Sequence, residues 1–188
     1  MNTNLSLKDI KHRAILNSAT ELLALKPTAT LQEIADYSKI GIATLHRHFV
    51  SREALLDELA MNAIHLVRET FTTLTIDPYD MNSSLKRLFD ALIPLGNKIY
   101  FLDAAASVDE NPTIVAGEAS LKHPILEAIE IWQHNGYLKK NVSSRWMMNV
   151  IYSLLFITWR DIQAGNLAKN DATDLLLDTV LSGFSVIK

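Results

Sequence analysis

The residues of this chain best suited to binding chemistry lie between Thr30 and Phe49, in the stretch TLQEIADYSKIGIATLHRHF. The second half of this stretch carries hydroxyl, imidazole and guanidinium groups on Thr44, His46 and Arg47. Such groups donate hydrogen bonds to phosphates and to the edges of bases. The stretch therefore predicts recognition of a nucleic acid, provided that its local structure presents these side chains on one surface.

Two short helices separated by a tight turn are the structure that the stretch predicts. Thr30 and Glu33 have the spacing of a capping box, in which each side chain binds the backbone N–H of the other residue. Residues 37–39 form the turn, and the second helix is expected over residues 41–48. Its expected buried positions are Ile40, Leu45 and Phe49. A helix–turn–helix of this kind can insert its second helix into the major groove of DNA.

This motif resembles the DNA-binding signature of the tetracycline-repressor (TetR) family, which runs IA…AGVSxGTLYxHFxSKEAL. The matching positions are Ile34, Ala35, Ile40, residues 44–49 and residues 51–55. The resemblance covers residues 12–56, under a third of the chain. It departs from the signature at Gly41, Ala43, His46 and Arg52, where Ser, Gly, Tyr and Lys are usual.

The resemblance implies a transcriptional regulator that binds double-stranded DNA through its second short helix. The residues expected to bind DNA are Thr30, Lys39, Gly41, Ile42, Ala43, Thr44, His46, Arg47, His48 and Arg52. We expect Thr44 and Arg52 to contact phosphates. We expect base edges to be contacted by Ile42, Ala43, His46 and Arg47. Lys8, Lys11, His12 and Arg13 either approach flanking phosphates or form a solvated surface.

The charge distribution fits a basic head on an acidic body. The whole chain has 188 residues, 48% of them apolar, and a net charge of −3. Residues 1–52 carry seven Lys and Arg against four Asp and Glu, whereas the remainder carries 11 against 17. The chain has no cysteine, which excludes disulfides and thiolate metal sites. Without a signal-like N-terminus or a spanning stretch, we expect a cytoplasmic protein that does not enter a membrane.

No pattern in the sequence predicts an enzyme, a metal site or a cofactor. Gly-rich phosphate loops, G-x-S-x-G and H-E-x-x-H are all absent from the sequence. His46 and His48 are two residues apart on a helix, so their side chains diverge. We therefore expect neither catalysis nor a bound metal, and no cofactor.

The hydrophobic periodicity predicts an all-α fold of about nine helices, with no sustained period-two alternation. We expect a three-helix DNA-binding domain over residues 1–52 and a helical ligand-binding and dimerisation domain over residues 53–188. The remaining expected helices span residues 6–25, 52–74, 78–93, 98–108, 112–135, 143–165 and 170–187. Residues 94–96 should end the helix before them, and Pro124 should interrupt or kink its helix near Lys122.

The helix over residues 145–162 is apolar nearly all round, so it must be buried on more than one side. Either the bundle encloses it, or a second subunit covers one face. Members of the family dimerise through their last two helices, which favours a homodimer. The expected interface residues are Ile151, Leu155, Trp159, Leu176, Val180, Leu181 and Phe184.

The middle helices are expected to enclose a small-molecule effector, as in the family. The expected ligand-binding residues are His65, Phe71, Phe89, Tyr100, Phe101, Asp103, Trp132 and Tyr152. This set favours a largely apolar ligand oriented by one or two polar groups. For each aromatic residue, packing in a filled core is the alternative interpretation. Asp103 lies in an apolar run, where its carboxylate must find a partner or face water.

The sequence thus predicts a DNA-binding transcriptional regulator, and specifically a repressor. It should bind a near-palindromic operator as a dimer and release it when a small apolar ligand binds. Two alternatives stay open: a helical ligand-binding or interaction protein with a degenerate DNA-binding head, and a helical enzyme.

Overall fold

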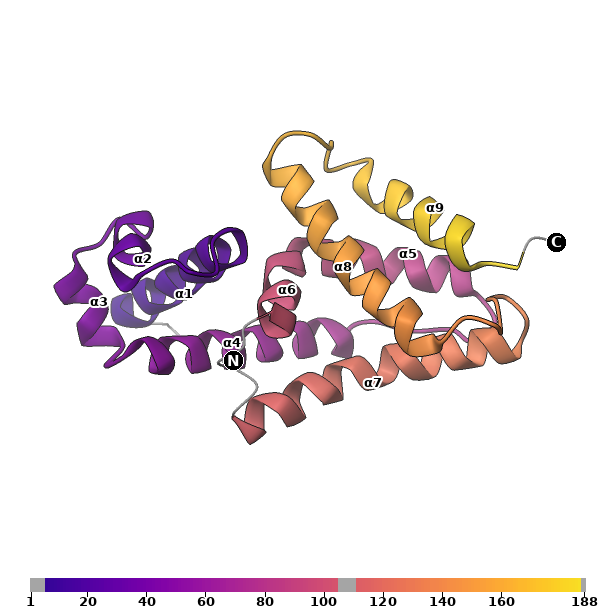
Figure 1. Ribbon diagram of the computed structural model, residues 1–188, viewed down its shortest axis with the longest axis horizontal. Helices are drawn as coiled ribbons and strands as arrows, with labels where there is room; N and C mark the ends of the chain where they lie inside the picture. The colour runs from indigo at the N-terminus through magenta and orange to yellow at the C-terminus, as the bar shows by residue number, and fades with distance from the viewer. Residues whose placement is uncertain (1–5, 105–110, 187–188) are drawn as a thin grey trace.

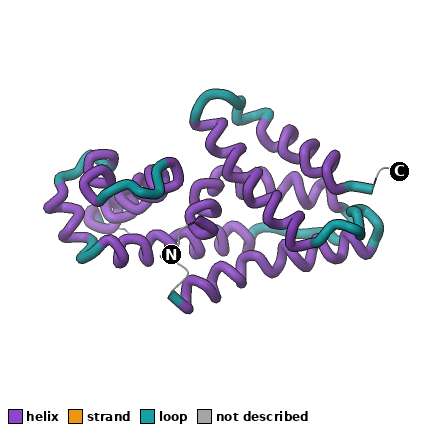
Figure 2. Tube along the Cα trace, in the orientation of Figure 1, coloured by secondary structure: helices purple, strands orange, loops and turns teal. Residues whose placement is uncertain are grey.

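The computed structural model describes residues 6–104 and 111–186, and every regular element within these ranges is helical (Figure 2). Its α-helices are α1 (Leu7–Leu25), α2 (Leu31–Tyr37), α3 (Ile42–His48), α4 (Arg52–Thr72), α5 (Met81–Leu92), α6 (Gly96–Ala104), α7 (Pro112–His134), α8 (Ser144–Gln163) and α9 (Ala172–Phe184). A 3₁₀ turn, η1 (Ile93–Leu95), joins α5 to α6. The prediction of an all-α fold with about nine helices is confirmed.

The helices form a small head and a larger body joined by a shared helix (Figure 1). The head contains α1, α2 and α3. Helix α4 starts in the head and runs into the body, where it packs against α7 and α6. Helix α1 also packs against α6, so two contacts attach the head to the body. The predicted domain boundary at residue 52 falls at the first residue of α4 and stays a prediction.

The head is built from locally determined helix starts around one core. Ser6 caps α1 and Thr30 caps α2, each in a reciprocal capping box with the acidic residue three positions later. Leu45 and Phe49 of the second half of the motif are 1% and 2% exposed. Burying each of these side chains contributes about 1.5–3 kcal/mol relative to leaving it in water. The predicted helix–turn–helix is therefore present, with the turn beginning after Tyr37 rather than at it.

Several helix boundaries differ from the prediction by one to three residues, among them the starts of α5 and α6. Helix α5 begins at Met81 instead of residue 78, because the Asp80 carboxylate accepts from the Ser83 N–H and caps the helix there. Asp77 instead donates its N–H to the Ser84 hydroxyl, which holds the preceding loop. Helix α6 begins at Gly96, two residues earlier than expected. The part of the expected helix beyond residue 104 lies outside the described residues.

The prediction that Pro124 interrupts its helix is wrong, because the helix is not broken there. Helix α7 runs without a break from Pro112 to His134 and contains Pro124. Proline removes one backbone hydrogen bond from a helix interior. On either side of it, Leu121 and Ile125 are 5% and 1% exposed. Packing of α7 against α4 and α8 compensates for the lost bond.

Gly96 marks the closest contact between α6 and α8. A Cβ atom at this position would lie 2.6 Å from the Leu155 carbonyl oxygen and 2.6 Å from the Trp159 Cβ. Real Cβ atoms do not approach backbone that closely, so only glycine permits this packing. The contact places α6 directly between α1 of the head and α8 of the body.

We expect Gly96→Ala to destabilise the fold by about 2–3 kcal/mol, because α6 and α8 must separate to admit the methyl group. Urea or thermal unfolding followed by circular dichroism measures this change. Gly41→Ala is the matched control, since nothing lies within 4 Å of an added Cβ there. Equal stability of the two variants would show that the α6–α8 contact is looser than described.

Candidate nucleic-acid interface and body pocket

The outer face of α3 presents the polar residues expected to contact DNA. Ala43, His46 and Arg47 are exposed, while Ile42 and Thr44 are half-buried. Gly41 is the N-cap of α3 and supplies no side-chain hydrogen bond, so the first N–H groups of the helix have no side-chain partner there. This face combines small, hydroxyl and basic groups on one short helix, which suits the major groove.

Basic groups flank this face on the neighbouring elements. Lys39, in the turn between α2 and α3, adopts a left-handed conformation with φ 55° and is exposed. Lys8 and Lys11 are exposed on α1. Thr30 is exposed, but its hydroxyl is engaged in the cap of α2. The structure thus leaves the lysines available to phosphates while Thr30 already has a structural partner.

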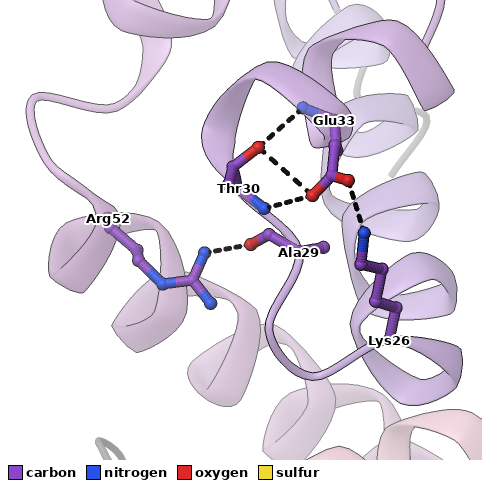
Figure 3. Close-up of polar contacts among 5 residues, drawn as sticks. All are labelled: Lys26, Ala29, Thr30, Glu33 and Arg52. Atoms are coloured by element: carbon purple, nitrogen blue, oxygen red, sulfur yellow. Dashed lines mark hydrogen bonds and ion pairs between the residues drawn. The ribbon is translucent and has the colours of Figure 1, made fainter.

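Arg52 lies at the start of α4 and its guanidinium group faces the loop before α2 (Figure 3). It donates to the carbonyl oxygen of Ala29 and, at 3.2 Å, to that of Pro27. The planar fork of an arginine can serve two carbonyl groups at once, which a lysine ammonium does less well. The structure therefore places Arg52 as a brace between α4 and the start of α2.

Glu33 completes the start of α2 in the same region (Figure 3). Its carboxylate accepts from the Thr30 N–H at 2.8 Å and pairs with the Lys26 ammonium. The Lys26 contact, followed by the Thr30 backbone N–H, lowers the pKa of Glu33 to about 2. Glu33 thus stays ionised at neutral pH, and its support of the α2 cap is lost only as the pH falls from about 4.5 towards 2.

His48, the last residue of α3, turns inwards, unlike His46 and Arg47. Its Nδ1 lies 3.1 Å from Nδ1 of His12 on α1. On the other side of the His12 ring, Nε2 pairs with the carboxylate of Glu58 on α4. His48 is half-buried. The structure therefore separates His48 from the outward-facing residues expected to bind DNA and joins it to two other helices.

The residues expected to bind an effector do not form one cluster. Phe89, Phe101 and Trp132 are 0%, 4% and 1% exposed and belong to the core. Phe71 is half-buried, and His65 is exposed in a polar groove between α1 and α4. The prediction for Asp103 concerns a side chain outside the described part of the structure. Tyr100 and Tyr152 line two recesses in the body.

Two adjoining recesses lie beside α6 and α8. The inner recess is lined by Val67, Ile99, Leu102, Glu118, Leu121, Lys122 and Tyr152, and the outer recess by Ile99, Tyr100, Tyr152, Ser153, Phe156 and Ile157. Including their open mouths, their empty volumes are about 310 and 520 Å³. The room inside the inner recess, about 20 Å³, holds roughly one water. A ligand must therefore open it further.

The inner recess contains a pair of opposite charges that the sequence analysis did not select. Glu118 and Lys122 pair at 2.6 Å with side chains only 18% and 28% exposed. The Lys122 ammonium also lies 5.8 Å from the centroid of the Tyr152 ring. Their i, i+4 spacing was visible in the sequence, but nothing there indicated that this side of α7 faces a recess. The recess thus combines apolar walls with one carboxylate and one ammonium group.

The residues expected at a dimer interface lie mainly inside the chain. The side chains of Ile151, Leu155, Trp159, Leu176 and Val180 are all at most 6% exposed, and Leu181 and Phe184 are half-buried. Helices α8 and α9 retain other exposed apolar residues on their outer sides. These are Trp146, Ile157 and Leu175, together with Val186 two residues beyond the end of α9, and their exposed fractions are 40–60%. We call these four residues the outer α8–α9 face.

Comparison with known proteins gives a consistent result. Residues 15–59 match the family model described as bacterial regulatory proteins, tetR family. The chain is 23% identical over 175 residues to the HTH-type transcriptional repressor LfrR of Mycolicibacterium smegmatis, covering 91% of this chain and 88% of that protein. Both matches include the helix–turn–helix described above.

Solved structures show the same fold. The TetR-like regulator LfrR of Mycobacterium smegmatis has a TM-score of 0.69 at 22% identity, covering 96% of this chain and 98% of its own. The structure of LfrR in complex with proflavine has a TM-score of 0.66 at 23% identity. The match covers 95% of this chain and 99% of that chain. The ketosteroid transcriptional regulator KstR2 of Mycobacterium tuberculosis has a TM-score of 0.62 at 18% identity. The match covers 100% of this chain and 97% of that chain. Within the described residues, no helix has the length and apolar character needed to cross a membrane.

The bracing geometry of Arg52 predicts a distinct behaviour for its variants. Arg52→Lys keeps the positive charge but loses one of the two carbonyl contacts, so we expect about 1 kcal/mol lower stability and an unchanged salt slope of DNA binding. Arg52→Ala should behave in the same way with a larger loss of stability. Thermal unfolding and binding isotherms at several salt concentrations measure both quantities. A salt slope reduced by about one in Arg52→Ala alone would instead identify a phosphate contact.

Proposed function

We propose that this chain, a DNA-binding transcriptional regulator of the TetR family, represses transcription from a near-palindromic operator that it binds as a homodimer. The observation that carries the proposal is the exposed basic and hydroxyl face of α3 within the segment that matches the family. The similarity to a protein named as a transcriptional repressor supports repression as the output. The family comprises regulators and not enzymes. Because its target is chromosomal DNA, we also propose a cytoplasmic location.

Within this proposal, some residues on and near α3 contact base edges and others contact phosphates. His46 and Arg47, with Ala43 beside them, are exposed and are assigned to base edges. Thr44 and Lys39 are assigned to phosphates, which carry affinity but no sequence information. Arg52 is assigned to bracing the head because its guanidinium group is already bound to two carbonyl oxygens.

The proposed dimer uses the outer α8–α9 face. Four large apolar side chains are exposed there. Apolar side chains gathered on one face typically mark an interaction site, and the proposal takes these four as one face. Gly183 on α9 has open space around it, which permits close approach of another backbone. Two identical heads joined in this way would address two half-sites about 34–36 Å apart.

We expect Leu175→Glu and Ile157→Glu to produce monomers at micromolar concentration, because each places a charge in the proposed interface. Sedimentation velocity measures the change, and operator affinity should fall with it. Val115→Glu on α7 is the control, since Val115 is similarly exposed, at 44%, but lies outside the outer α8–α9 face. A monomeric parent protein would contradict the proposed dimer.

The effector is proposed to enter the inner recess and widen it towards the outer one. The apolar walls and the rings of Tyr100 and Tyr152 suit a flat, largely apolar molecule. Glu118 and the Tyr152 ring hold the Lys122 ammonium, so a cationic group of the ligand would take the place of that ammonium beside them. The structure of LfrR with proflavine supplies a suitable probe, because proflavine is a planar aromatic cation. A ligand that displaces α6 would act on the head through α1, which packs on the same helix.

We expect Glu118→Gln to weaken proflavine binding about tenfold and to reduce the release of DNA by proflavine in proportion. The physical reason is the loss of the carboxylate that balances the cation. Fluorescence titration measures the affinity. Glu127→Gln, on an exposed part of α7, is the matched control and should bind like the parent. Equal affinities for all three proteins would remove Glu118 from the effector site.

Repression itself is tested by selecting, from the genome of the source organism, the DNA fragments that the purified protein retains. Transcription in vitro from a retained promoter should fall when the protein is added. Activation of that promoter would contradict repression, and failure to retain any fragment would favour a head that no longer recognises an operator.

A further inference from the structure

The contact between His12 and His48 has a chemical requirement that no function assigned so far explains. Two ring nitrogens 3.1 Å apart form a hydrogen bond only if one carries a proton and the other keeps a lone pair. The four ring nitrogens of the pair can together carry two, three or four protons. With two or three protons on the pair, one of the two Nδ1 atoms can stay unprotonated. With four, two N–H groups face each other and the contact must open.

This contact occupies a critical place in the head. Helix α3 has seven residues, of which Leu45 alone is buried, and the following Phe49 is buried as well. Among the described residues, the contact from His48 to His12 is the polar side-chain contact that holds α3 to another helix. The His12 ring also lies 5.0 Å from the Phe49 ring, between centroids. The end of α3 is therefore held to α1 through His12.

The opposite side of His12 extends the connection to the body. Its Nε2 pairs with the carboxylate of Glu58 on α4, the helix that runs from the head into the body. Since a carboxylate accepts and does not donate, His12 must keep its Nε2 proton and donate it. The proton between the two Nδ1 atoms is thus the variable one. His12 joins α1, α3 and α4 at a single ring.

We propose that His12 is a positioning residue for DNA binding, which holds the recognition helix α3 in place while the His12–His48 pair carries at most one positive charge. A second charge on the pair opens the contact and frees the end of α3. The head would then lose specific affinity for DNA in mildly acidic conditions. The proposal concerns DNA binding alone and does not depend on the output or the effector proposed above.

The electrostatic surroundings of His48 agree with this assignment. Burial, followed by the positive charges of His12, Lys8 and Lys11, lowers the pKa of His48, and Glu58 acts in the opposite direction. Those groups come from α1 and α4, while His46 and Arg47 on α3 itself lie on its exposed face. Because the pKa of His48 in the folded state lies below the ordinary value of 6.5, neutral His48 makes its full contribution to the stability of the fold above pH 6.5. It is lost as the pH falls through the lowered value.

The experiment uses the unsubstituted full chain, and comparison with His12→Asn separates the histidine pair from His46, which also faces the DNA. Amide hydrogen exchange of residues 45–49, corrected for the intrinsic rate, and imidazole ¹⁵N spectra are recorded from about pH 8 to about pH 5. Affinity for a fragment retained in the genomic selection is measured over the same range. We expect exchange to rise and affinity to fall about tenfold between pH 7 and 5.5. The spectra should show a single proton shared by the two Nδ1 atoms at pH 7.

Two substitutions of the same residue separate positioning from general stability. The terminal amide of His12→Asn lies near the place of Nδ1 and can either donate or accept, so this variant should keep its affinity at pH 7 and lose the pH dependence. His12→Phe fills the space without a polar group, so it should bind weakly at every pH. His123→Asn is the control, because His123 also has a glutamate neighbour but lies on α7.

Several outcomes would overturn the proposal. One is a parent whose α3 exchange does not change with pH. Another is exchange that rises without a loss of affinity. A third is His12→Asn keeping the full pH dependence. Loss of binding upon addition of EDTA at pH 7 would reassign the two Nδ1 atoms to a metal and overturn it as well. If no DNA fragment is retained, exchange and spectra still test the shared proton.

Discussion

The head depends on the burial of Leu45 and Phe49 in a core formed mainly by other helices. A helix of seven residues has too few hydrogen bonds to persist alone in water, because its nucleation cost is not repaid. Helices α1, α2 and α4 supply the surface against which these two side chains pack. The orientation of α3 is thus a property of the whole head. Residues such as Arg52 and His12, which brace the head, bear on DNA binding without facing DNA.

The sequence predicted the elements whose determinants are local. The capping box at Thr30 requires residues only three positions apart, and it occurs as the pattern indicates. A second box of the same spacing, at Ser6, starts α1. One error arose where distant packing overrides a local signal, and another where neighbouring cap positions compete. Pro124 stays inside α7 because the helix is packed on both sides of it, and α5 begins after the Asp80 cap instead of at residue 78. The packing around Pro124 cannot be read from a neighbourhood of a few residues.

The candidate sites were less predictable than the fold, for a physical reason. Helical periodicity separates buried from exposed positions but does not say which helix covers a buried face. Phe89 and Trp132 therefore read as pocket residues although they fill the core. Glu118 and Lys122 read as an ordinary surface pair although they enter a recess. Similarly, the most apolar stripes of α8 and α9 face inwards, and the outer face is carried by fewer side chains.

The double attachment of the head, through α4 and through the packing of α1 on α6, has a thermodynamic consequence. A head on a single flexible linker would sample many orientations and would lose that freedom when two heads engage one duplex. Ordering of this kind subtracts directly from the free energy of association. A head held at two points has already given up most of that freedom during folding. Its affinity for DNA can therefore rest on a small number of contacts from a very short helix.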